Sequence, residues 1–136
     1  MKVKLTNVAA QRLLTALRNI DNNENVKLAG LTRLDIARNI NRMFPLVTSF
    51  ERVASARRRE LMPGEENHAA NNIIVDDLEK MSYQEVEFKL IAIDKDLLRL
   101  DDNSRITGET IASLAPIIKG FDSLKDDDDE PNVESS

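Results

Sequence analysis

One stripe of apolar residues constrains the fold of this chain more than any other feature. From Thr32 onward, side chains that are apolar except at one arginine recur at alternating intervals of four and three residues: Ile36, Ile40, Met43, Val47, Phe50, Ala54, Arg57 and Leu61. This spacing is typical of one face of an α-helix. The stripe therefore predicts a long helix, which the run Met62-Pro63-Gly64 ends.

Pro45 lies inside this predicted helix. Its ring clashes with the carbonyl of Asn41 and it has no N–H to bond there, so a kink or a break is expected. The stripe from Ile36 to Leu61 would span roughly 39 Å as a helix. The rest of a domain this small does not readily cover that length, so a second copy in a homodimer, or a groove on a larger protein, is expected to cover the excess.

Two other segments predict strands. Residues 2–5 alternate polar and apolar side chains, and residues 86–93 do the same. The second segment also fits a helical spacing, but a strand there would give residues 2–5 a partner. Shorter helices are expected after Thr6 or Asn7, after Asn72 and after Thr107, each of which can cap a helix. The expected fold is α+β and mainly α, with a long kinked helix and shorter helices packed on a small two-stranded antiparallel sheet.

Charge divides the chain into three parts. The 136 residues suit a single domain, expected over residues 1–121, followed by a flexible acidic tail at residues 122–136. Residues 1–60 have a net charge of +7, residues 61–121 of −6 and the tail of −6. We expect the two halves of the domain to face each other or to present opposite charges to partners. The densest acidic run comprises Asp126, Asp127, Asp128, Asp129 and Glu130.

The composition argues against an enzyme. The chain has no Cys and one His, His68, which excludes thiol chemistry and most His-based sites. It has no phosphate-binding glycine loop, no nucleophile elbow and no zinc-protease motif. The acidic residues from Asp94 to Asp102 do not have the spacing of a calcium loop. No catalytic residue, no metal ligand and no cofactor is therefore predicted, and no apolar run is long enough to span a membrane.

Arginines of the long helix are the predicted partner-binding residues. Four of them fall on the face opposite the apolar stripe and three follow near its end: Arg33, Arg38, Arg42, Arg52, Arg57, Arg58 and Arg59. Such a row can follow the phosphates of a nucleic acid. The sequence pI near 5.0, the absence of aromatic residues among the arginines and the acidic second half favour protein carboxylates as their partners instead.

The order of these segments resembles a family of small uncharacterised proteins encoded by tailed bacteriophages and prophages. The resemblance rests on Met-Lys-Val-Lys-Leu at residues 1–5, on Val-Lys-Leu at 26–28 ahead of the long helix, on residues 84–93 and on Ile-Thr-Gly-Glu-Thr at 106–110. It implies a phage origin, a place in the bacterial cytoplasm or the virion, and a role in virion assembly, takeover of a host protein or inhibition of a host defence. The expected function is stoichiometric binding to a larger phage or host protein, and nucleic-acid binding through the arginine face is the alternative.

Overall fold

The computed structural model describes residues 1–120, so the expected acidic tail and the run at 126–130 lie outside the described residues. Strand β1 (Lys2–Thr6) pairs antiparallel with β2 (Glu85–Lys89). Val3 lies opposite Phe88, and both are buried because the alternating pattern turns one face of the sheet to the core. The predicted antiparallel sheet and the α+β, mainly α, fold class are confirmed.

The second strand is shorter than its alternating pattern predicts. It ends at Lys89, and residues 90–92 have no regular structure. Strand β3 (Ile93–Asp94) then pairs in parallel with β4 (Ile118–Lys119). The sequence pattern did not predict this second sheet, whose two strands have two residues each. Just past the β1–β2 ladder, the side chain of Asn39 takes up both backbone groups of Ile91.

Helix α1 (Asn7–Asp21) lies at the centre of the molecule. Thr6 begins it as predicted, since its Oγ1 accepts a hydrogen bond of 3.1 Å from the Ala9 N–H. Its stripe of Leu13, Leu17 and Ile20 is almost completely buried. Helices α2 and α4 both pack on α1, and so its apolar stripe forms the middle of the core.

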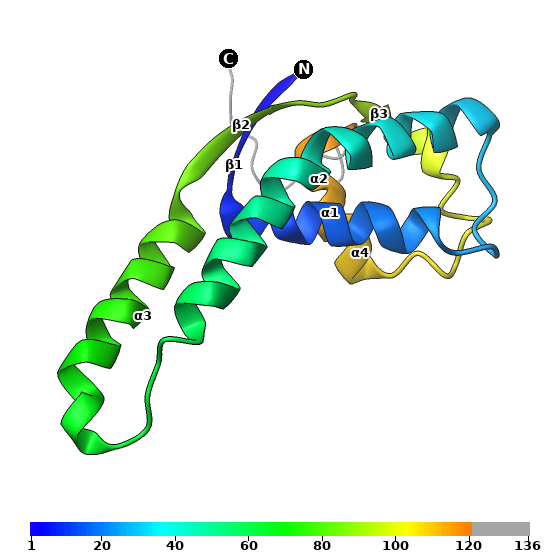
Figure 1. Ribbon diagram of the computed structural model, residues 1–136. Coiled ribbons are helices and arrows are strands. Elements are labelled where there is room, and N and C mark those ends of the chain that lie inside the picture. Colours follow the sequence, from blue (N-terminus) through cyan, green and yellow to red (C-terminus); the bar gives the residue numbers. More distant parts are fainter. Residues whose placement is uncertain (121–136) are drawn as a thin grey trace, which may run out of the picture.

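Helix α2 (Gly30–Arg58) is continuous through Pro45, so the expected break does not occur. Figure 1 shows instead that the direction of α2 changes part-way along its length. Pro45 is exposed, so its ring faces water on the side of α2 that is turned away from the core. The helix begins earlier than predicted and ends three residues before Leu61, which is 38 % exposed and not part of the buried stripe.

Helix α3 (His68–Tyr83) follows a short 3-10 helix, η1 (Glu65–Asn67). It begins four residues before Asn72, so the predicted cap at Asn72 is wrong.

Near the C-terminus, helix α4 (Gly108–Leu114) is capped by Thr107 as predicted, with Thr107 Oγ1 accepting from the Thr110 N–H at 3.1 Å. Two further 3-10 helices, η2 (Lys95–Leu98) and η3 (Ala115–Ile117), border the short parallel sheet.

An arm of two helices extends from this core. We define the arm as residues 46–58 of α2, the connection 59–67 and α3. Figure 1 shows these segments running side by side beyond α1 and α4. Three buried side chains of the arm, Phe50, Ala54 and Ile74, lie outside the main apolar cluster. The arm therefore has a small apolar core of its own, and Ile74 is the one residue of α3 that is fully buried.

Candidate functional site

An ion pair joins the two helices of the arm. Arg57 Nε lies 2.9 Å from Asp77 Oδ2, and Arg57 Nη1 lies 2.7 Å from Glu60 Oε1. The Arg57 side chain is 28 % exposed and that of Asp77 is 48 % exposed, so water screens the pair only in part. The hydrogen bond to Asp77, followed by that to Glu60, raises the pKa of Arg57 above its ordinary value. This predicted partner-binding residue thus has an internal role, which is to hold α3 against α2.

Two more of the predicted arginines also bind within the chain. Arg33 donates hydrogen bonds to the carbonyl oxygens of Asp21, Asn23 and Val26, and so it closes the loop between α1 and α2. Arg42 Nη1 donates to the Lys89 carbonyl at 3.2 Å and fastens α2 to the end of β2. Neither guanidinium is fully available to a partner.

The remaining four arginines differ from these. Arg38 forms a weak ion pair of 3.6 Å with Asp35 one turn away and is 54 % exposed. Arg52, Arg58 and Arg59 are exposed and have no ion pair or side-chain hydrogen bond with any of residues 1–120. The structure therefore divides the predicted arginine face, and the three arginines without a partner among residues 1–120 lie in the last two turns of α2 or directly after it.

The end of α2 and the connection after it present apolar side chains beside these cations. We call Arg58, Arg59, Leu61 and Met62 the arm tip. Met62 is 58 % exposed, yet its backbone is held on both sides by Asn71. The Met62 N–H donates to Asn71 Oδ1 at 3.1 Å, and Asn71 Nδ2 donates to the Met62 carbonyl at 2.6 Å. The sequence analysis missed this site, because only the fold brings Asn71 to Met62.

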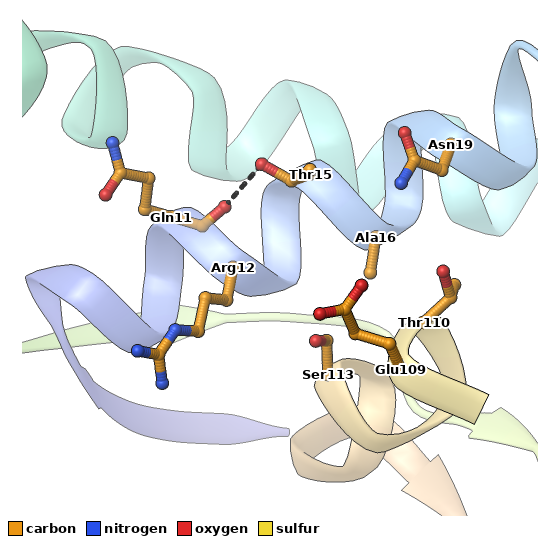
Figure 2. A pocket seen from close by; sticks show the side chains of 8 residues that line it. All are labelled: Gln11, Arg12, Thr15, Ala16, Asn19, Glu109, Thr110 and Ser113. Atoms are coloured by element: carbon orange, nitrogen blue, oxygen red, sulfur yellow. Dashed lines mark hydrogen bonds between the residues drawn. The ribbon is translucent and has the colours of Figure 1, made fainter. Parts of the chain in front are cut away.

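A polar groove lies between α1 and α4, with a volume of about 360 Å³. Its lining, drawn in Figure 2, comprises Gln11, Arg12, Thr15, Ala16, Asn19, Glu109, Thr110 and Ser113. Several of these polar groups already have partners. Thr15 Oγ1 donates to the Gln11 carbonyl at 2.9 Å, and Gln11 Nε2 donates to Glu51 Oε2 at 2.7 Å.

No hydrogen bond joins the serine of the groove to a side-chain base within residues 1–120. In Figure 2, Glu109 lies beside Ala16 while the Arg12 guanidinium points away from it. Ser113 is the one serine of the lining, and His68, the single histidine, stands at the start of α3 in the arm. A serine nucleophile is normally activated by an adjacent base held within hydrogen-bond distance. The lining offers hydrogen bonds to water or to a polar chain, and no activated nucleophile.

Three findings bear on metal binding, on membrane insertion and on similarity to known proteins. No group of three or more His, Cys, Asp or Glu side chains in residues 1–120 is placed to hold a metal ion. Within the same residues, no helix combines the length and the apolar character needed to cross a membrane. Comparisons with protein-family models, with curated proteins and with solved structures found no match to this chain. The functional argument therefore rests on the arm and its side chains.

Proposed function

We propose that this protein acts without catalysis, by stoichiometric binding of a larger phage or host protein through the arm tip. The observation that carries the proposal is the presentation of Met62, an exposed apolar residue whose backbone N–H donates to Asn71 Oδ1 and whose carbonyl accepts from Asn71 Nδ2. Fixing a contact residue before association lowers the entropy that binding costs. The arm tip is therefore preorganised, because its backbone at Met62 is fixed before a partner binds.

Charge supports a protein carrying carboxylates as the partner. Arg58 and Arg59 flank the apolar residues of the tip and have no partner among residues 1–120. Apolar side chains surrounded by arginines are typical of protein interfaces, where methionine and arginine are enriched. The resemblance to tailed-phage proteins supplies the candidate partners, which are a virion protein during assembly or a host defence protein in the bacterial cytoplasm.

The test begins with the full chain, tagged and expressed in bacterial cells, and captured with and without nuclease. Proteins recovered after nuclease treatment are identified by mass spectrometry, purified and mixed with the chain to measure affinity and stoichiometry. We expect a 1:1 ratio of chains and a loss of binding for the variant Met62→Ser combined with Arg59→Ser.

The matched control is Leu97→Ser, which removes an apolar side chain of similar exposure, 47 %, from η2 outside the arm. It should bind the partner as the native chain does. Equal binding by the tip variant and the native chain would exclude the tip as the binding site. Recovery of nuclease-sensitive material alone would favour nucleic-acid binding through the free arginines.

A further inference from the structure

A second surface of the arm is defined by the ion pair between Arg57 and Asp77. This pair shows which sides of α2 and α3 lie next to each other, since its Nε–Oδ2 distance is 2.9 Å. Val53 precedes Arg57 by one helical turn, and Ile73 precedes Asp77 by one turn, so both lie on the side of the arm that carries the pair. Leu46, seven residues before Val53, lies on the same side of α2.

These three residues form what we call the arm side face. Leu46 is 47 % exposed, Val53 is 45 % exposed and Ile73 is 67 % exposed. The solvent side of a helix in a monomer normally carries polar residues. A face with three large aliphatic side chains around one ion pair is instead typical of a surface that another chain covers.

The charges of the two helices identify the chain that fits this face. Residues 47–58 of α2 hold three arginines and one glutamate, which gives a net charge of +2. Helix α3 holds three acidic residues and one lysine, which gives a net charge of −2. A second copy can therefore place its α3 against α2 of the first and its α2 against α3, and each helix then meets the opposite charge.

We propose that two copies of this chain pack their arm side faces together, with α2 of each copy against α3 of the other, and so form a four-helix bundle. The arrangement is isologous, because one surface meets the same surface related by a twofold axis. The packing of four amphipathic helices around an apolar centre is a standard solution for helices that cannot bury their faces in pairs. The dimer leaves the arm tips free and presents two of them to a larger partner, which raises avidity.

Light scattering on the purified full chain, over a wide range of concentration, tests this proposal. The native chain should show a mass near twice its 15.3 kDa, falling toward one chain on dilution. Ile73→Glu adds a charge to the face, and we expect it to raise the dissociation constant about tenfold or more. Val53→Gln, which adds no charge, should weaken the dimer in the same direction.

Leu97→Glu is the matched control, because Leu97 is as exposed as Leu46 and lies on η2, away from the arm. It should remain a dimer, and circular dichroism should show native helix content for every variant. A native chain that stays monomeric at all concentrations would overturn the proposal, and so would a dimer that Ile73→Glu and Val53→Gln leave unchanged. The result is separable from the proposed function, because a monomer can still bind a partner through its tip and a dimer can lack one.

Discussion

Asn39 and Ile91 are joined by two hydrogen bonds across 52 positions of the sequence, with Asn39 Nδ2 donating to the Ile91 carbonyl at 3.0 Å and the Ile91 N–H donating to Asn39 Oδ1 at 2.7 Å. The Asn39 side chain is completely buried on α2. A buried polar group is tolerated when its hydrogen bonds are made. The asparagine thus takes the place of a strand partner for Ile91, and it fixes the segment between β2 and β3 against α2.

The first prediction concerns this pair. Asn39→Ala should lower the free energy of unfolding by about 2–4 kcal/mol, because it leaves both backbone groups of Ile91 without a partner and opens a small cavity. The urea midpoint followed by circular dichroism measures the change. Asn41→Ala, an exposed position on the same helix, is the control and should change stability by less than about 0.5 kcal/mol. Equal effects of the two variants would contradict the assigned role.

The second prediction concerns Asn103, the other buried asparagine, which is 2 % exposed. Its Oδ1 accepts from the Lys27 N–H at 2.7 Å, and its Nδ2 donates to the carbonyls of Lys27 and Leu98, both at 2.9 Å. Asn103→Ala should cost about 2–3 kcal/mol. It should also speed hydrogen exchange of the Lys27 amide, which loses its acceptor.

The control for Asn103 is Asn25→Ala, an exposed asparagine in the loop that precedes Lys27. We expect native protection of the Lys27 amide in this variant. Unchanged exchange at Lys27 in Asn103→Ala would mean that another group holds the loop between α1 and α2.

The third prediction uses the pKa of Arg57, which is raised chiefly by its hydrogen bond to Asp77. A cation whose folded pKa is raised stabilises the fold at every pH below its unfolded pKa, and that contribution is lost only as pH rises through the folded value. This raised pKa lies far above neutral pH, so the contribution should be constant from neutral pH to beyond about pH 10. In Arg57→Lys the pKa of the lysine is about 10.4 in the unfolded chain, so the stabilising contribution of this cation should disappear at a lower pH than that of Arg57.

Urea unfolding of both proteins at neutral pH and near pH 11, followed by circular dichroism, measures this difference. The gap in midpoint between the native chain and Arg57→Lys should widen at the higher pH. Lys80→Arg is a control. Lys80 pairs with Asp76 on the exposed side of α3, and the Lys80 side chain is itself 75 % exposed. A gap that is independent of pH would show that the charge of residue 57 does not hold the arm together.

The fourth prediction concerns Pro45. The proline is exposed, and its ring removes one backbone hydrogen bond from a helix that is otherwise continuous. Pro45→Ala should raise the free energy of unfolding by about 1–3 kcal/mol, because alanine restores the bond to the Asn41 carbonyl. Thr48→Ala, one turn later and also exposed, should add less than about 1 kcal/mol. A destabilised Pro45→Ala would show that the change of direction in α2 supports the packing of core and arm together.

Local patterns predicted the elements that depend on local physics. The alternation at residues 2–5, the cap at Thr6 and the apolar stripe of α2 are each visible within a few residues, and each is confirmed. Of the kink or break expected at Pro45, the break does not occur, because α2 is continuous there and buried residues, Met43 and Val47, lie on both sides of the proline. The change of direction of α2 in Figure 1 agrees with the kink. The end of β2 at Lys89 was missed because the alternating pattern continues to Ile93, and no local signal shows that the Ile91 backbone bonds to Asn39, 52 positions away.

The candidate site was less predictable for a related reason. A row of arginines on a helix looks the same in sequence whether or not the guanidinium groups have partners. Arg33 and Arg42 meet backbone carbonyls that only the fold brings to them. Arg57 is the one charged residue of the apolar stripe, and its carboxylate partner is Asp77 of the same chain. Asn71 carries no sequence signal that would mark it as the support of Met62.

The pairing of β1 with β2 also determines when the sheet can form. Met1 and Leu90, 89 positions apart, exchange two backbone hydrogen bonds, of 2.7 and 2.9 Å. During synthesis, β1 leaves the ribosome long before its partner strand has been translated. Val3 and Leu5 therefore remain unpaired while some eighty residues are added, which takes roughly 4–16 s at typical rates of translation. For that interval the nascent chain exposes a strand that ribosome-associated chaperones can bind.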